Sequence, residues 1–376
     1  MNVFFQNIRV INPAQQLDEV VNLWVKDGRI AHLSPDDAAT DSDTKMIPGE
    51  NLVCAPGFFD MHVHFREPGE EYKEDIRSGS ESAANGGFTG VLCMPNTDPA
   101  IDDIIKVEYV KNKAKGLLVD VHTSAALTKG RGGEFLTPMM ELSDAGVPLF
   151  TDDGSAVMNS EIMRRIFDYA ASKDLLVAQH CEDHNLTNNF SMNESFLSDK
   201  LGLKGYPTVA EDIIVSRDIL LAEYSGNRRY HIAHISSAGA IELVKNAKQK
   251  GLRVTTEATP HHFCLTEELI VGYEPDLKMN PPLRENKDVQ AVLEALADGT
   301  IDCIATDHAP HALHEKDVEY ENAPYGVVGL ETALGLAMTF LVHKNVLSMD
   351  QLIEKMSINP RRILGFDPVT IRNGEI

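Results

Sequence analysis

Short apolar runs alternate with longer amphipathic segments along most of the chain, beginning near residue 53. Eight of these runs predict buried strands, and the segments 161–172, 209–224 and 238–250 carry apolar residues at helical spacing. Strands that alternate with helices are typical of parallel βαβ units. The pattern therefore predicts an α/β fold, a (β/α)8 TIM-like barrel. The expected strands are 53–64, 89–94, 118–124, 148–151, 175–180, 230–235, 253–258 and 303–306.

The first 52 residues have a different pattern, typical of β-structure. Apolar side chains cluster at 7–11 and 20–25, and Asp27-Gly28 provides a tight turn before a third strand at 29–33. We expect residues 1–52 to form part of a small β domain beside a barrel at 53–365. Because a few strands alone are marginally stable, we expect residues 366–376 to begin a return to this domain, with further strands following residue 376.

Loop and turn residues complete the predicted layout. A left-handed glycine commonly ends a helix, and glycines in this role are expected at Gly86, Gly116, Gly146, Gly226 and Gly251. Residues 185–206 are a long polar stretch between a strand and its helix. We expect this stretch to be a polar cap on the surface.

Charge and composition narrow the possible partners. The chain has 34 Lys and Arg against 57 Asp and Glu, a net charge of −23. This charge disfavours nucleic-acid coating and docking on anionic membranes, but a few local cations can still bind a small anionic substrate. We expect a cytoplasmic protein. The five cysteines form no CxxC pair, the N-terminus does not resemble a signal peptide, and no apolar run approaches 18 residues.

The first barrel strand ends in Asp60-Met61-His62-Val63-His64-Phe65-Arg66. Residues i and i+2 of a strand face the same side, so His62 and His64 should point into one space. Active sites of this architecture lie at the carboxyl ends of the strands. Two imidazoles converging there indicate a transition-metal site.

Other strands also deliver a His or an Asp where the chain emerges. These residues are Asp152, Asp153, His180, His234 and Asp307. The set suits two divalent ions, one on His62, His64 and Asp307 and the other on His180 and His234, with a carboxylate between them. Such a site can activate water and polarise a carbonyl, which is hydrolytic chemistry at an amide-like centre or its reverse.

Substrate-binding candidates surround the same rim. Arg66 shares the face of His64 and can present its guanidinium fork to a carboxylate. Asn96 closes the second strand, and Asn280 and His311 can reach in from neighbouring loops. The polar run 311–326, which ends Pro324-Tyr325-Gly326, predicts a mobile lid over the mouth.

These residues lie in nine short motifs: DMHVHFREPG (60–69), CMPNT (93–97), TDDG (151–154), QHCED (179–183), HIAHISS (231–237), EATPHH (257–262), MNPPLR (279–284), ATDHAPH (305–311) and YGVVGLET (325–332). In this order and spacing they closely resemble a bacterial type I dihydroorotase of the amidohydrolase superfamily. The resemblance extends from about Asn7 to the end of the chain. It implies reversible, zinc-dependent cyclisation of N-carbamoyl-L-aspartate to L-dihydroorotate, a step of pyrimidine (UMP) biosynthesis.

The resemblance also implies a role for each site residue. Asp153 and a hydroxide would bridge two zinc ions, and Asp307, besides binding zinc, would take a proton from the hydroxide and pass it to the leaving nitrogen. The metal ligands implied are His62, His64, Asp153, His180, His234 and Asp307. The substrate-binding residues implied are Arg66, Asn96 and His311 for the carboxylate, and Asn280, Tyr325 and Gly326 for the carbamoyl part.

Many relatives bridge their metals with a carboxylated lysine, whereas the type I branch uses an aspartate. Lys129 is the only lysine near the relevant strand end, and it lies in a Thr-Lys-Gly-Arg-Gly loop. Asp153 is therefore the expected bridge, with Asp152 the less favoured neighbour. The family also implies a small β-sandwich completed beyond this chain, a homodimer, and a possible association with an aspartate transcarbamoylase.

Two alternatives use the same scaffold. A hydantoinase or allantoinase shares the metal site, but these enzymes usually have the carboxylated lysine and lack the FREPG and MPNT elements that here supply Arg66 and Asn96. A catalytically inactive dihydroorotase-like scaffold for a transcarbamoylase typically loses metal ligands, whereas this chain keeps all six.

Overall fold

The computed structural model describes residues 2–36 and 40–375, in which eight parallel strands form a closed ring. Two arcs, β6-β7-β8 and β9-β10-β13-β14-β15, are joined by the bridges Ala125–Phe150 and Val63–His308. The predicted barrel strands are thereby found in chain order. Their bounds are β6 (Phe58–Val63), β7 (Phe88–Cys93), β8 (Asp120–Thr123), β9 (Leu149–Phe150), β10 (Leu176–Gln179), β13 (Tyr230–Ile232), β14 (Val254–Ala258) and β15 (Cys303–Ile304).

The single strand predicted at 53–64 is wrong, because the chain divides it between two sheets. β5 (Val53–Cys54) pairs with the N-terminal strand β1, and the barrel strand β6 begins only at Phe58. Pro56 between them has no backbone N–H to donate. Gly57 is required by close packing, since a Cβ there would lie 2.3 Å from the Thr89 side chain.

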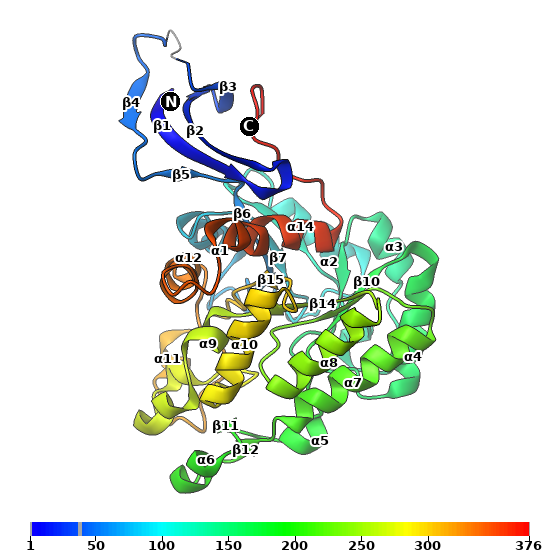
Figure 1. The fold of residues 1–376 in the computed structure, drawn as a ribbon. Coiled ribbons are helices and arrows are strands. Elements are labelled where there is room, and N and C mark those ends of the chain that lie inside the picture. Colours follow the sequence, from blue (N-terminus) through cyan, green and yellow to red (C-terminus); the bar gives the residue numbers. More distant parts are fainter. Residues whose placement is uncertain (1, 37–39, 376) are drawn as a thin grey trace.

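Helices cover the outside of the ring and pack on its strands (Figure 1). Three of them fall where helical spacing predicted them: α4 (Ser160–Ala170), α7 (Val209–Tyr224) and α8 (Ala238–Gln249). Side chains cap the N-termini of α4 and α8: Asn159 accepts a hydrogen bond from Glu161 N, and Ser237 accepts one from Ala240 N. Other helices of the layer are α1 (Ile76–Asn85), α2 (Ile104–Lys113), α3 (Met139–Asp144), α10 (Asn286–Asp298), α12 (Ala333–Ala337) and α14 (Asn359–Leu364).

One of the five predicted left-handed glycines is wrong. Gly86 has φ −76°, and the following Gly87 takes the left-handed conformation with φ +85°. Gly86 is instead required by close contact, because a Cβ would lie 2.2 Å from Leu330 O. The other four predicted positions have positive φ.

The N-terminal residues form a separate small sheet at the amino end of the ring (Figure 1). Its strands are β1 (Val3–Asn12), β2 (Leu17–Lys26), β3 (Arg29–Ser34) and β4 (Lys45–Pro48), in the order β3-β2-β1-β4 with β5 also on β1. The C-terminal segment returns to this sheet, since Ile30 N donates to Glu375 O (2.8 Å) and Gly374 N donates to Ile30 O (2.7 Å). A second sheet of a sandwich, and the domain boundaries 1–52, 53–365 and 366–376, stay predictions.

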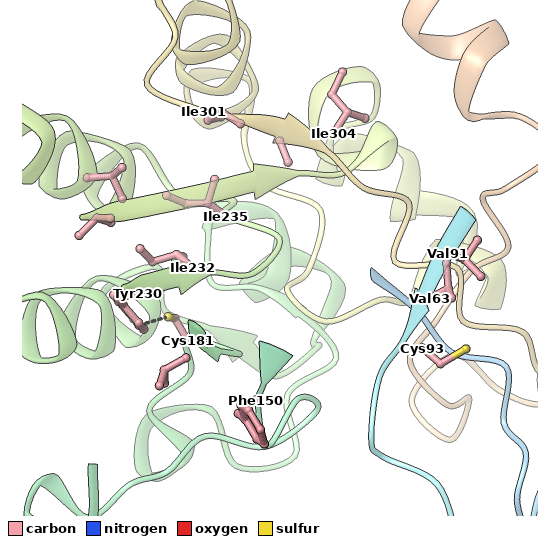
Figure 2. Close-up of a cluster of buried hydrophobic side chains, with 14 of the residues drawn as sticks. Val63, Val91, Cys93, Phe150, Cys181, Tyr230, Ile232, Ile235, Ile301 and Ile304 are labelled. Carbon is pink, nitrogen blue, oxygen red and sulfur yellow. Dashed lines mark hydrogen bonds between the residues drawn. The ribbon is translucent and has the colours of Figure 1, made fainter. Parts of the chain in front are cut away.

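Apolar side chains fill the ring at the amino ends of its strands and the layer between strands and helices. Phe59, Met61 and Leu176 belong to a cluster closed by Ile363 and Leu364 of α14. Figure 2 shows part of the larger cluster, which includes Val63, Val91, Phe150, Ile232 and Ile304. Polar side chains are thus left for the carboxyl ends of the strands. In the described part of the chain no helix is long and apolar enough to span a membrane.

Residues 185–206 are more than the polar surface cap expected from their sequence. They contain part of α5 (His184–Thr187), the short strands β11 (Met192–Asn193) and β12 (Gly205–Tyr206), and α6 (Phe196–Leu201). Met192 and Leu203 pack with Ile270 and Tyr320, and Phe190 and Tyr206 pack with Ala210 and Tyr325. The stretch therefore contributes to two small apolar clusters, which its many polar residues conceal in the sequence.

Candidate metal centre and substrate pocket

Four histidines and two aspartates converge at the carboxyl ends of the barrel strands. His62 and His64, at the end of β6, have ring centroids 5.3 Å apart and lie on one side, as the i, i+2 spacing predicts. His64 Nε2 lies 2.9 Å from Asp307 Oδ1, and His62 Nε2 lies 3.6 Å from the same oxygen. Asp307, after β15, therefore faces both imidazoles.

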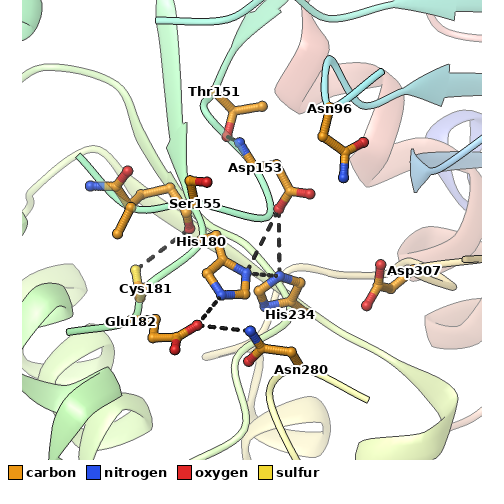
Figure 3. Close-up of polar contacts among 12 residues, drawn as sticks. Asn96, Thr151, Asp153, Ser155, His180, Cys181, Glu182, His234, Asn280 and Asp307 are labelled. Carbon is orange, nitrogen blue, oxygen red and sulfur yellow. Dashed lines mark hydrogen bonds and ion pairs between the residues drawn. The ribbon is translucent and has the colours of Figure 1, made fainter. Parts of the chain in front are cut away.

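A second histidine pair, His180 and His234, lies against Asp153 (Figure 3). His180, after β10, places Nδ1 2.9 Å from Nε2 of His234, after β13. Asp153 lies between the pairs: its Oδ1 is 3.6 Å from His234 Nε2 and 4.0 Å from His180 Nδ1, and its Oδ2 is 3.4 Å from His62 Nε2 and 3.6 Å from His64 Nε2. One carboxylate thus presents an oxygen to each pair, the arrangement a bridging ligand requires.

The donor atoms fit divalent metal ions. Two groups have ligand atoms all within 4.8 Å of one another, His62–His64–Asp307 and His62–Asp153–His234. Among the described residues, His62 Nε2 and Asp153 Oδ1 are buried without a hydrogen-bond partner. Buried polar atoms normally have one, and imidazole nitrogen with carboxylate oxygen is a preferred donor set for zinc. A metal ion satisfies both observations.

The ionisable side chains of this centre stabilise one another's charged forms. Burial opposes ionisation of Asp153, but His62, His234 and His64 outweigh it and hold the pKa of that carboxyl well below its usual range. Burial likewise opposes the charged form of His62, yet Asp153 and Glu257 raise its pKa well above the ordinary histidine value. The centre keeps its carboxylates ionised in a buried setting, which creates a strong requirement for cations.

Three of the histidines are oriented through their second ring nitrogen. His62 Nδ1 lies 2.5 Å from Glu257 Oε1, His180 Nε2 lies 2.8 Å from Glu182 Oε2, and His64 Nδ1 lies 2.8 Å from Asn96 Oδ1. Such contacts fix the tautomer of metal-binding imidazoles. Neither Glu182 nor Glu257 was predicted as a site residue, although each lies in one of the nine motifs at a strand end, where an acidic residue was the available signal.

The two competing bridge candidates face elsewhere. Asp152 accepts hydrogen bonds from Thr128 N (3.0 Å) and from the Thr128 hydroxyl. Lys129 donates Nζ to Asp102 O (2.8 Å). The carboxylate within reach of both histidine pairs is that of Asp153.

A pocket opens directly above this centre. Arg66 is 9% exposed and has a left-handed backbone (φ +61°); its Nε donates to Pro310 O (3.1 Å). Gly326 also has positive φ (+137°), and a Cβ there would lie 2.6 Å from Ala309 O. The pocket is lined by His64, Arg66, Asn96, Asp153, Gly154, His180, His234, Asn280, Asp307, Ala309, Tyr325 and Gly326.

Comparisons with known proteins identify the family of this chain. The Dihydro-orotase-like family matches residues 51–240. Curated relatives named dihydroorotase include those of Syntrophus aciditrophicus (strain SB), 48% identical over 375 residues, and Geobacter sulfurreducens, 47% identical over 375 residues; each alignment covers 100% of this chain and 88% of the relative. The chain belongs to the dihydroorotase family.

Solved structures support the same fold for this dihydroorotase-family chain. The L-hydantoinase (dihydropyrimidinase) from Arthrobacter aurescens superposes with a TM-score of 0.83 at 24% identity, covering 96% of this chain and 82% of that chain. The dihydropyrimidinase from Brevibacillus agri gives 0.82 at 18% identity, covering 100% and 84%. The (β/α)8 prediction is therefore confirmed as a fold, and at these identities the likeness carries no statement about substrate.

Two residues predicted to bind substrate, Asn280 and His311, have protein partners in this dihydroorotase-family chain. Asn280 Nδ2 donates a hydrogen bond to Glu182 Oε2 (2.8 Å), and the buried Asn280 Oδ1 has no partner in the described chain. His311 lies behind the pocket wall, where its Nε2 is 2.8 Å from Tyr325 O and 3.4 Å from Arg66 Nη2. Burial lowers the pKa of His311 to about 4, so its ring is neutral near pH 7.

The run 311–326, whose Tyr325 and Gly326 line the pocket, is held by hydrogen bonds at several points. Lys316 Nζ donates to Pro275 O and Pro324 O, both at 3.0 Å, and Lys278 Nζ donates to Glu321 O (2.8 Å). The Tyr325 hydroxyl donates to Phe190 O, and the two rings stack with centroids 4.7 Å apart. The stretch 185–206 therefore supports the pocket wall, and mobility of the run 311–326 stays a prediction.

Proposed function

We propose that this protein interconverts L-dihydroorotate and N-carbamoyl-L-aspartate in pyrimidine biosynthesis, as a metal-dependent cyclic amide hydrolase. The observation that carries the proposal is a single pocket in which Asp153 lies between two histidine pairs, with Asp307 on one side and Arg66 at the rim. Family membership across the full chain points to the same reaction.

We propose two zinc ions as the cofactor, one held by His62, His64 and Asp307 and the other by His180 and His234, with Asp153 shared. When bound, they would lower the pKa of a water molecule and polarise the scissile carbonyl. The charge of the surrounding groups supports a count of two zinc ions, because two divalent cations balance the negative charge of four buried carboxylates around the centre. These carboxylates are Asp153, Glu182, Glu257 and Asp307.

Asp307 is the proposed proton carrier. In hydrolysis the oxygen of water adds to the ring amide carbonyl, the carbon–nitrogen bond breaks, and the leaving nitrogen must gain a proton. Burial opposes its ionisation, but His64 and His62 lower the pKa of Asp307 below its usual value, so it starts as a base. It would take the proton from water and return it to nitrogen, and ring closure would reverse the order.

Arg66 is the proposed anchor for the substrate carboxylate, together with Asn96, and His311, which lies outside the pocket lining, would support Arg66 from behind. The Arg66 guanidinium can bind a carboxylate in a bidentate manner. Asn96 Oδ1 faces His64, and among the described residues Asn96 Nδ2 has no hydrogen-bond partner, so it can donate to a substrate. Asn280 and the backbone of Tyr325 and Gly326 would contact the carbamoyl part. These contacts select a small dicarboxylate despite the protein's overall charge of −23.

The test is a direct assay of both directions after metal removal and zinc reconstitution. We expect interconversion of dihydroorotate and carbamoyl aspartate to depend on zinc, and dihydroorotate to be preferred to hydantoin or allantoin. A higher kcat/KM for hydantoin would favour the hydantoinase alternative. Zinc-loaded protein without turnover would favour the inactive scaffold.

We further propose a cytoplasmic homodimer, able to associate with an aspartate transcarbamoylase, on the basis of family membership alone. Analytical ultracentrifugation of the protein, alone and mixed with the transcarbamoylase of the same organism, tests both parts. A monomer that does not change its sedimentation on mixing would contradict them.

A further inference from the structure

The seventh strand of the ring, β14, contributes a buried acid for which the proposed mechanism has no use. Glu257 is 1% exposed and lies outside the described lining of the pocket. It therefore has no route to the substrate. A buried charge is costly unless it is paired, so its partners indicate its purpose.

Those partners are the groups that build the metal centre. Glu257 Oε1 lies 2.5 Å from His62 Nδ1 and 3.4 Å from the backbone N of His234, and Oε2 lies 3.3 Å from His231 Nε2. The His231 ring is held in turn by Thr255 Oγ1, 2.8 Å from its Nδ1. One carboxylate thus links a ligand on β6 to the turn that carries a ligand after β13.

We infer that Glu257 is a positioning residue that sets the tautomer of His62 and so directs its Nε2 lone pair to the metal. An anion at Nδ1 holds an imidazole proton on that nitrogen, so that a metal ion would replace the proton on Nε2 and bind the electron pair there. Nε2 is the buried atom of His62 that has no hydrogen-bond partner in the described chain. The inference rests on the proposed metal centre and adds a ligand-orienting role to it.

The decisive variant is Glu257→Gln, which keeps size and removes charge. Its amide can turn an N–H toward Nδ1 and favour the tautomer that cannot bind metal through Nε2. We expect roughly a 10–100-fold loss of affinity for one of two zinc ions, measured by competition with a chromophoric zinc chelator. Activity should recover as zinc is raised to saturation, which a general packing defect would not allow.

The matched control is Glu267→Gln. Glu267 is also buried, but its carboxylate accepts from Asn193 Nδ2 (2.7 Å) in the stretch 185–206. Both zinc affinities should stay at the wild-type value in this variant. Zinc affinities within twofold of wild type in Glu257→Gln would overturn the inference.

A crystal structure of the zinc-loaded wild type provides a test that does not depend on a folded variant. Zinc on His62 Nε2, with Glu257 in hydrogen-bond contact with Nδ1, is the expected result. Glu257 bound to zinc, or turned away from His62, would overturn the role. Glu257-dependent zinc binding in a protein that does not convert dihydroorotate would contradict the proposed function and still support this inference.

Discussion

Two buried polar clusters of this protein differ in how the hydrogen-bonding capacity of their atoms is satisfied. The first, the Arg284 network, consists of Arg284, Glu211, Ser236, Asn193 and Glu267. Arg284 is 1% exposed and donates to Ser236 Oγ (3.0 Å), Asn193 Oδ1 (2.8 Å) and Glu211 Oε2 (3.0 Å). Its guanidinium is matched by protein acceptors.

The second cluster is the metal centre, where His62 Nε2 and Asp153 Oδ1 are equally buried but lack hydrogen-bond partners among the described residues. Burial and polarity are the same in both clusters, so neither property alone identifies a functional site. Unpartnered donor atoms that converge on a pocket do identify one, whereas a mutually satisfied network indicates a structural role. Substitutions should therefore affect turnover in one cluster and stability in the other.

The largest effect on turnover is expected for Asp307→Asn. Without a proton carrier kcat should fall about 10³-fold, within the usual range for general acid–base catalysis, while KM changes little. The matched control is Asp298→Asn, because Asp298 forms a surface pair with Lys245 (2.8 Å). Steady-state kinetics on both variants would contradict the assignment if Asp307→Asn kept a wild-type kcat.

The largest effect on stability is expected for Arg284→Leu. The change removes the cation that pairs with the buried Glu211 carboxylate and the donor to Asn193 Oδ1, so the free energy of unfolding should fall by about 3 kcal/mol or more. Arg253→Leu is the control, since Arg253 pairs with Asp174 (2.6 Å) at the surface and such pairs contribute about 1 kcal/mol or less. Denaturant titration measures the free energy of unfolding of both variants. Equal losses of this free energy would contradict a structural role for the Arg284 network.

A smaller effect, on substrate binding, is expected for Arg66→Met. Loss of a charge-assisted contact to the substrate carboxylate should raise KM roughly 10–100-fold, with a lesser change in kcat. Arg131→Met is a useful control, because Arg131 donates to Asp152 O (3.3 Å) and Ser155 Oγ (2.9 Å). An unchanged KM in Arg66→Met would exclude the proposed anchor.

The smallest effect concerns His311 and pH. Burial lowers its pKa from 6.5 to about 4, so the folded protein resists protonation more than the unfolded chain does. This group therefore reduces the free energy of unfolding as pH falls from 6.5 toward 4. Comparing the thermal stability of wild type and His311→Asn across this window isolates its contribution. A difference between them that is independent of pH would contradict the assignment.

Much of the barrel could be predicted from sequence because local patterns determine it. Alternating apolar runs located all eight strands, and i, i+2 spacing placed His62 and His64 together. The predictions were wrong where a contact distant in sequence determines the structure. The 53–64 strand is divided because Val53–Cys54 pairs with β1, and Gly86 is required by the close approach of Leu330 O rather than by a left-handed conformation.

The same difference between local patterns and distant contacts applies to the site. Ligand candidates at strand ends were predictable because parallel strands emerge at one end of the ring. The partners of those ligands were not, since Glu257 is 195 residues from His62 in sequence and no spacing rule connects them. The packing of 185–206 against Tyr325 was equally hidden, because it depends on contacts such as Phe190 with a residue 135 positions away.

The central claim is that the unpartnered cluster is a binuclear metal centre that performs dihydroorotase chemistry. The most direct measurement is a zinc titration of metal-free protein, with dihydroorotate hydrolysis followed at each addition. Activity should rise from near zero and level off at two zinc ions per chain. Full activity in metal-free protein, or a zinc-saturated protein that leaves dihydroorotate unchanged, would contradict the account.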